Sequence, residues 1–153
     1  MDDISKRSLK VIRTFNATAE LLWKVLTTPE YIKEWWGPDG FTNTIRKMDV
    51  REGGKWDFTM HAPDGTDYEN EYVYSTIIQM KKIVLDHLRE PKFTIIISIH
   101  EEGSKTTIEW FNIFDSIPTK EEAVRAFKAD VGLEQNLQRL ADHISQHMHK
   151  IKK

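Results

Sequence analysis

The chain has 153 residues, with 22 basic against 24 acidic side chains and a formal net charge of -2. This length suits a single domain, and no basic face stands out that would favour nucleic acid. The absence of cysteine excludes disulfides, thiol catalysis and cysteine zinc sites. No signal peptide and no apolar run of the ~20 residues that span a bilayer is visible, so we expect a cytoplasmic protein without membrane contact.

The first part of the sequence predicts one strand and two short helices. Residues 9–15 alternate loosely between apolar and polar side chains, as a half-buried strand does. A helix with an apolar face is predicted over residues 19–27, and a second over residues 30–36. The second helix ends at Gly37-Pro38, because proline disfavours helical geometry in the residue before it.

The middle of the sequence predicts strands joined by tight turns. Strands are expected over residues 41–50, 55–61, 71–78, 83–88, 92–100 and 106–114. Gly53-Gly54 and Pro63-Asp64-Gly65 mark turns, since glycine tolerates unusual backbone angles and proline presets one of them. Short turns between consecutive strands favour an antiparallel meander.

The C-terminal part predicts one long helix over about residues 119–149, which begins with a capping-box pattern at Thr119. Its apolar stripe consists of Ala123, Ala126, Phe127, Leu133, Leu137, Leu140, Ala141, Ile144 and Met148. Asp130 falls inside this stripe. Gly132 interrupts the helix, which indicates either a close approach by another segment or a bend.

An amphipathic helix of this length cannot bury its stripe alone. A twisted antiparallel sheet of six or seven strands can wrap around it, and the two early helices then close one end. The sequence therefore predicts an α+β fold in one domain, residues 1–153, with room for a cavity between sheet and helix.

Several short motifs occur together in this order. They are Thr28-Pro29, Trp35-Trp36-Gly37-Pro38, Gly53-Gly54-Lys55-Trp56, Pro63-Asp64-Gly65 and Gly132-Leu133-Glu134-Gln135-Asn136-Leu137. The set resembles the SRPBCC superfamily, and within it the bacterial branch related to the activator of the heat-shock-protein-ninety ATPase. The resemblance covers about residues 8–149. It implies the helix-grip, or START-like, fold: a curved antiparallel sheet around a long C-terminal helix, with a hydrophobic cavity between them.

This fold makes a set of residues candidates for binding a ligand in the cavity. They are Trp35, Trp36, Trp56, Phe58, Tyr72, Tyr74, His87, Trp110, Phe127, Asp130, Leu133 and Leu137. Aromatic side chains at strand spacing either line such a cavity or fill it as plain core. Asp130 is either exposed to water or a polar anchor inside the pocket, because a carboxylate on an apolar stripe needs a partner.

Two further expectations concern the tryptophan pair and the histidines. Neighbouring helical residues point about 100° apart, so Trp35 and Trp36 are predicted to differ clearly in burial, with one at the cavity mouth. His143 and His147 have the i, i+4 spacing of metal ligands but are predicted to face solvent. No metal, cofactor or catalytic residue is expected.

Three functions are compatible with the sequence. The first is a binding protein, not an enzyme, that holds a small hydrophobic or aromatic molecule, as a monomer or homodimer. The second is a protein-interaction module that stimulates a heat-shock-protein-ninety-type chaperone ATPase. The third is a cyclase-like or lyase-like enzyme that uses Asp130, His87 or a tyrosine as acid or base.

Overall fold

The computed structural model describes the backbone of residues 4–152 and the side chains of residues 4–146. Its elements are the 3-10 helix η1 (Ile4–Arg7), β1 (Ser8–Phe15), α1 (Ala19–Thr27), α2 (Pro29–Trp35), β2 (Thr42–Met48), β3 (Lys55–His61), β4 (Asp67–Ile78), β5 (Lys82–His87), β6 (Phe93–Glu102), β7 (Lys105–Phe114), α3 (Ile117–Phe127) and α4 (Ala129–Lys152). The seven strands form one antiparallel sheet in the order β1-β7-β6-β5-β4-β3-β2.

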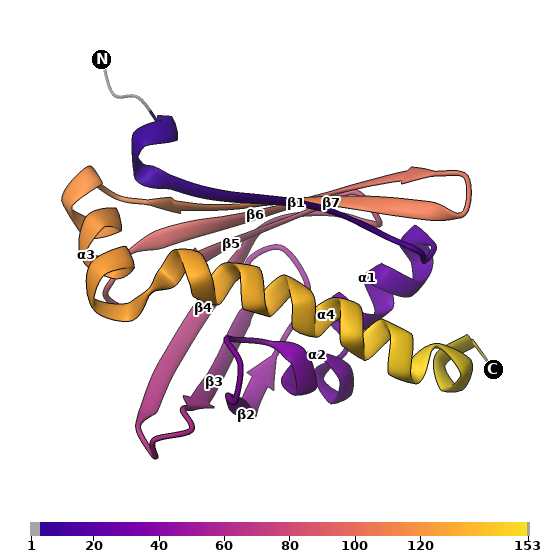
Figure 1. The fold of residues 1–153 in the computed structure, drawn as a ribbon, viewed down its shortest axis with the longest axis horizontal. Helices are drawn as coiled ribbons and strands as arrows, with labels where there is room; N and C mark the ends of the chain where they lie inside the picture. Colours follow the sequence, from indigo (N-terminus) through magenta and orange to yellow (C-terminus); the bar gives the residue numbers. More distant parts are fainter. Residues whose placement is uncertain (1–3, 153) are drawn as a thin grey trace.

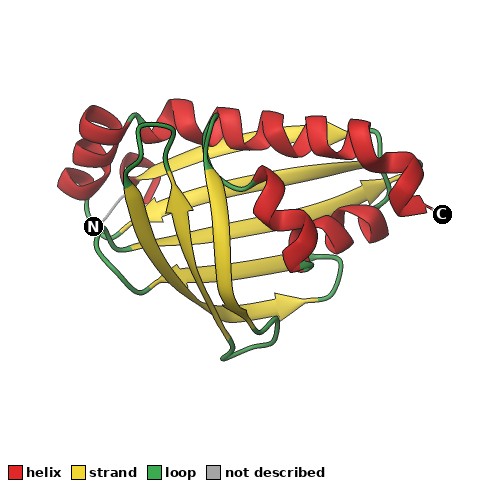
Figure 2. Ribbon diagram, turned by 90° about the horizontal axis from the view of Figure 1, so that it is seen from below, coloured by secondary structure: helices red, strands yellow, loops and turns green. Residues whose placement is uncertain are grey.

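The sheet is strongly curved, and α4 runs along the inside of the curve (Figure 1). Helices α1 and α2 lie on the same side of the sheet as α4, as the view from below also shows (Figure 2). This arrangement confirms the predicted helix-grip fold, with seven strands. The region enclosed by sheet, α1, α2 and α4 holds the hydrophobic core, in which Leu22, Ile108, Leu137 and Leu140 are fully buried.

The two early helices form where the sequence predicts them. Helix α1 has the predicted bounds, and the hydroxyl of Thr18 caps it by accepting a hydrogen bond from the amide of Leu21 at 3.2 Å. Helix α2 begins at Pro29, one residue earlier than predicted, because proline is well suited to the first helical position. It ends at Trp35, and Trp36 already has an extended backbone.

The prediction of one continuous C-terminal helix is wrong. Helix α3 ends at Phe127 and α4 begins at Ala129, because Lys128 between them takes the left-handed conformation with φ 52° and ψ 46°. The left-handed region is usually occupied by glycine or asparagine, so a lysine there carries no sequence signal for a break. The first helical residues also come earlier than predicted, since Ser116 is the N-cap of α3.

Gly132 lies inside α4 and does not break it. A Cβ atom at this position would lie 3.2 Å from Cγ of Pro38, in the segment that follows α2. The glycine therefore permits a close approach, which is one of the two interpretations left open by the sequence. This contact brings α4 against the segment between α2 and β2.

Candidate functional site

Six aromatic side chains meet in the region enclosed by the sheet, α1, α2 and α4, which we call the grip. We call these side chains the aromatic cluster. They are Trp35, Trp36, Trp56, Phe58, Tyr72 and Trp110, each at most 4% exposed. Their ring centroids lie between 4.2 and 6.5 Å from those of their neighbours in the cluster. The rings come from the end of α2 and from strands β3, β4 and β7, which the fold brings together although they are far apart in the sequence.

Strand alternation explains most of the cluster. Trp56 and Phe58 are two residues apart on β3, so both side chains point to the inner face of the sheet. Trp56 pairs directly with Tyr72 on β4, which places the two rings in a stacked arrangement at 5.6 Å. The β3 part of the cluster therefore follows from local sequence, and its neighbours follow from strand register.

The predicted difference in burial between the two neighbouring tryptophans is wrong. Trp35 is 1% exposed and Trp36 is 4% exposed. The geometric rule for neighbouring helical residues does not apply, because Trp36 lies one residue beyond the end of α2 with φ -69° and ψ 132°. The change of backbone direction at that point lets both indoles enter the grip.

The polar atoms of the cluster are not equally satisfied. The indole nitrogen of Trp35 donates to the carbonyl of Val25 at 3.1 Å, and that of Trp110 donates to Oδ1 of Asn112 at 3.0 Å. The indole nitrogen of Trp56 is buried and has no hydrogen-bond partner among the described residues. A buried N–H group without a partner is uncommon in native structures, so this one needs an explanation.

His87 extends the aromatic cluster beyond Tyr72. Its ring lies 4.8 Å from those of Tyr72 and Phe93, its Nδ1 is 2.9 Å from the carbonyl oxygen of Pro91, and its Nε2 is 3.0 Å from Oδ1 of Asn70. Burial lowers the pKa of His87, although its hydrogen bonds to backbone groups partly oppose this. Burial likewise raises the pKa of the Tyr72 hydroxyl.

The segment between α2 and β2, residues 36–41, is held by side chains of α4. The guanidinium of Arg139 donates to the carbonyl oxygens of Glu34, Trp36, Gly37, Pro38 and Phe41 at 2.8–3.2 Å. In addition, Oδ1 of Asn136 accepts from the amide of Gly37 at 2.9 Å, and Oε1 of Gln135 accepts from the amide of Asp39 at 3.1 Å. We call this segment the α2–β2 loop.

Sequence reasoning missed the role of these polar residues. Gly132, Gln135, Asn136 and Arg139 have the i, i+3, i+4, i+7 spacing of one helix face, which was a usable signal. The Gly37-Pro38 end of α2 was a second signal, since the last carbonyls of a helix need donors from elsewhere. Neither signal says that the two segments meet, because about a hundred residues separate them along the chain.

The sequence model of the activator of Hsp90 ATPase homolog 1-like protein family matches residues 16–145. The chain belongs to this family. The match includes the tryptophan pair, the double glycine and the part of α4 that contacts the α2–β2 loop. The resemblance inferred from those motifs is therefore confirmed.

Solved structures share the helix-grip fold of this family member. A protein from Arthrobacter aurescens has a TM-score of 0.86 at 17% identity, covering 95% of this chain and 90% of its own. A protein from Nitrosomonas europaea has a TM-score of 0.84 at 19% identity, with coverage of 97% and 99%. An AHSA1-like protein from Aeromonas hydrophila has a TM-score of 0.68 at 14% identity, with coverage of 90% and 93%. No curated protein matches the sequence.

Two of the candidate residues lie outside the grip of this family member. Phe127 is 61% exposed, and Asp130 is exposed as well. The reason is the break at Lys128, which takes Phe127 off the apolar stripe predicted for one continuous helix. Asp130 is therefore not a polar anchor in a pocket, and the interpretation that it faces water is the right one. Tyr74, Leu133 and Leu137 are buried in the core, and their contact with a ligand stays a prediction.

The histidine predictions have mixed outcomes. His143 is 6% exposed and its ring lies 6.0 Å from that of Tyr31, so the prediction that it faces solvent is wrong. The side chain of His147 lies outside the described residues. Among the residues that the structure describes, no three His, Asp or Glu side chains are grouped as metal ligands, and no helix is long and apolar enough to cross a membrane.

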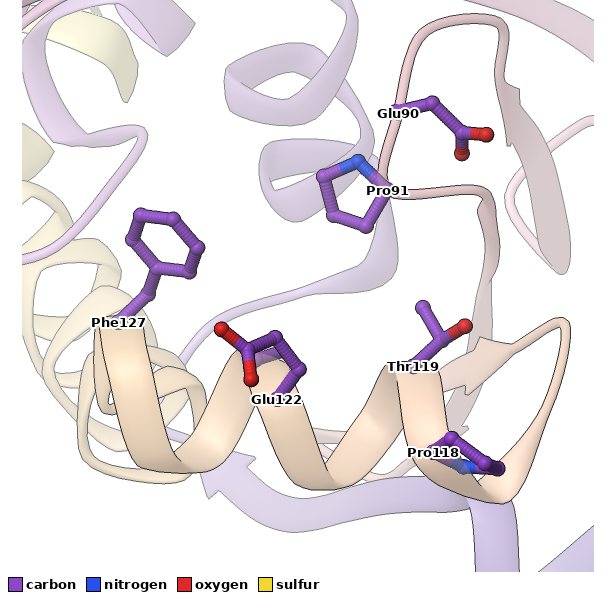
Figure 3. A pocket seen from close by; sticks show the side chains of 7 residues that line it. Glu90, Pro91, Pro118, Thr119, Glu122 and Phe127 are labelled. Carbon is purple, nitrogen blue, oxygen red and sulfur yellow. The ribbon is translucent and has the colours of Figure 1, made fainter.

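Two hollows open at the surface. One of about 380 Å³ lies between α3 and the turn after β5, where Thr119, Glu122 and Phe127 face Pro91 (Figure 3). The other, of about 230 Å³, is lined by residues that include Arg7, His87 and Phe93. Neither is lined by a member of the aromatic cluster. The predicted cavity-lining rings of the aromatic cluster are buried and pack against one another.

Proposed function

We propose that the protein binds a small planar aromatic molecule at the aromatic cluster, in the cytosol and without catalysis. We further propose that this molecule carries a hydrogen-bond acceptor. The family and the helix-grip fold support a binding role of this kind. The composition of the cluster supports the aromatic preference, because flat rings pack well against other rings in offset or edge-to-face geometry.

The observation that carries the proposal is the unpaired indole nitrogen of Trp56. Its side chain is 1% exposed, and the rings of Trp36, Phe58 and Tyr72 surround it. Leaving a buried donor without a partner costs about 1–3 kcal/mol relative to a satisfied one. A ligand acceptor atom next to Trp56 removes this penalty, so the cluster favours an aromatic molecule that carries such an atom.

A matched pair of probes tests the proposal. Quinoline and naphthalene have nearly the same shape, but only quinoline has a ring nitrogen that accepts a hydrogen bond. We expect isothermal titration or ligand-observed NMR to give quinoline about three- to tenfold tighter binding, the contribution of one net hydrogen bond. In the Trp56→Phe variant, which keeps a ring and removes the N–H group, the preference for quinoline should disappear.

The Trp110→Phe variant is the control. It also replaces an indole by a phenyl ring, but the nitrogen that it removes is already bonded to Asn112. The preference for quinoline should survive this change. Failure of both probes to bind at millimolar concentration, or an equal loss of preference in the two variants, would contradict the proposal.

A second candidate function is the contact with a heat-shock-protein-ninety-type chaperone that the family name suggests. The exposed apolar side chains of Phe127 and Val131 favour it, since they lie at adjoining ends of α3 and α4 and are 61% and 48% exposed. The test is the ATPase rate of such a chaperone with the wild-type protein and with Phe127→Ser. Stimulation that the substitution abolishes supports this function, and an unchanged rate with the wild-type protein excludes it.

A further inference from the structure

Trp36 differs from the other five rings of the aromatic cluster in what holds it. Four of these rings belong to residues of β3, β4 and β7, and Trp35 is the last residue of α2. Trp36 follows the end of that helix at the start of the α2–β2 loop, yet its ring lies within 6.5 Å of five others. A centrally placed ring is thus attached to a segment that belongs to no strand or helix.

The α2–β2 loop is tied to the body of the protein mainly through side chains. The loop backbone makes two bonds of its own, from the amide of Phe41 to the carbonyl of Pro38 at 3.2 Å and from the amide of Trp36 to the carbonyl of Ile32 in α2 at 3.0 Å. Two of its other amides are bonded to Gln135 and Asn136, and its carbonyls are bonded to Arg139. Asn43 adds one further bond to the carbonyl of Trp36. Opening the loop would therefore break no strand pairing, and the only helical backbone bond that it would break among the described residues is the one from Trp36 to Ile32 at the end of α2.

Arg139 is suited to holding a segment reversibly. Its five contacts use two nitrogen atoms that together carry four N–H groups, so at least one N–H group is shared between carbonyls. No carboxylate among the described residues lies within ion-pair distance of it, so carbonyl oxygens provide its polar contacts. Water can replace such carbonyls when the loop moves, because Arg139 is only partly buried.

The backbone of the loop allows such movement. Gly37 and Gly40 have φ angles of 100° and 83°, a region open to glycine, which also adopts other angles at little steric cost. Pro38 packs on Gly132 of α4 without a side chain between them. The missing side chain at position 132 therefore lets the closed loop lie close to α4.

We propose that the α2–β2 loop is a gate over the aromatic cluster, that Gln135, Asn136 and Arg139 form its latch, and that Trp36 is a plug which the ligand replaces. The indole of Trp36 occupies the ligand's place when the gate is closed. When the latch opens, Trp36 leaves with the loop and a planar ring of similar size can enter beside Trp56. What enters rests on the proposed function, whereas the gate itself can be tested without any ligand.

Hydrogen exchange measured by NMR tests the gate. In the wild-type protein, the amides of Gly37 and Asp39 should exchange at least tenfold faster than the paired amides of β6 and β7, since they open locally. The Arg139→Ala variant should accelerate them at least tenfold more and leave β6 and β7 unchanged. Arg51→Ala is the matched control, because Arg51 is exposed and its side chain pairs only with Asp49 in the described structure.

Two results would overturn the gate. One is exchange of Gly37 and Asp39 in the wild-type protein at the rate of β6 and β7, which means that only global unfolding exposes them. The other is equal acceleration of all amides in Arg139→Ala, which means that Arg139 supports the whole fold. If Arg139→Ala does not fold, Gln135→Ala replaces it: this change removes one bond, and faster exchange confined to Asp39 and its neighbours supports the latch.

Indole serves as the probe for the plug. Trp36→Ala should bind indole at least tenfold more tightly than the wild-type protein, because no plug has to leave first. Arg139→Ala should fall between the two. If the loop opens in Arg139→Ala but neither indole nor quinoline binds any form, the gate stands and the proposed function fails. If the probes bind while loop exchange is insensitive to Arg139, the gate is overturned and the proposed function stands.

Discussion

Replacing Trp36 by alanine should lower the free energy of unfolding by about 4 kcal/mol, in the range of ~3–5 kcal/mol for buried Trp→Ala changes. The side chain is 4% exposed and packs against five rings. A buried tryptophan removes about 150–250 Å² from water, which corresponds to roughly 4–6 kcal/mol at ~25 cal/mol per Å². Alanine keeps the Cβ and part of this area. Both routes therefore give the same magnitude.

The change isolates the side chain, because Arg139 and Asn43 bond to the carbonyl at position 36, which alanine retains. The assay is urea unfolding followed by circular dichroism, with the slope compared between variants. Trp23→Ala is the control: this indole is half-buried on α1, so its loss should cost about half as much. A loss below about 1.5 kcal/mol for Trp36→Ala would refute close packing of the indole and favour a place at a cavity mouth.

Three further predictions follow from single positions. A Cβ at Gly54 would lie 2.1 Å from the backbone oxygen of Asp49, so Gly54→Ala should lower the free energy of unfolding by more than about 3 kcal/mol. A Cβ at Gly53 would meet open space, but the backbone there has φ 85°, so Gly53→Ala should lower the free energy of unfolding by about 1 kcal/mol. Lys128→Gly should raise the melting temperature. Glycine relieves about 1–2 kcal/mol of left-handed strain and loses about 0.4–1 kcal/mol through the greater entropy of the unfolded chain, so the net gain is roughly 0.5–1 kcal/mol. A lower melting temperature would contradict the backbone argument. Burial depresses the pKa of His87 below 6.5, so as the pH falls the unfolded chain binds a proton at this residue before the folded protein does. The contribution of His87 to the free energy of unfolding is therefore complete above pH 6.5 and is lost as the pH falls from there through the pKa of the folded state. His87→Phe should therefore flatten the stability curve between about pH 7 and 5, and an unchanged slope would count against this sign.

The packed interior changes how binding by this family member has to be understood. A protein with an open cavity admits a ligand directly, whereas here the rings of the cluster are buried against one another. Any ligand that enters has to displace a side chain, and its apparent affinity is reduced by the small fraction of open protein. The proposed plug and latch would place that fraction under the control of three polar side chains on α4.

The local elements could largely be predicted from the sequence. Alternation on β3, the cap at Thr18 and the proline at the start of α2 are local signals, and each produced the expected element. The family motifs extended these elements to the fold, including the curved sheet around the last helix. The inward orientation of Trp56 and Phe58 followed from the period of two alone.

The errors at Phe127 and Trp36 occurred where one backbone conformation redirected a side chain. Lys128 took the left-handed conformation that is usually left to glycine, and this took Phe127 off the predicted apolar stripe. Trp36 lay one residue past the helix end, so the rule for neighbouring helical residues did not apply. A pattern read along the sequence assumes a regular backbone, and it fails where the backbone is irregular.

The sequence by itself determined the strands, the early helices and which ring-bearing residues of β3 face the core, because these depend on neighbours within a few positions. Only the tertiary structure decided that the rings pack against one another, that the indole nitrogen of Trp56 has no partner among the described residues, and that Arg139 holds the α2–β2 loop. Each of these depends on contacts between segments that are distant along the chain. Such contacts are set by how the sheet curves around α4, and no local pattern records them.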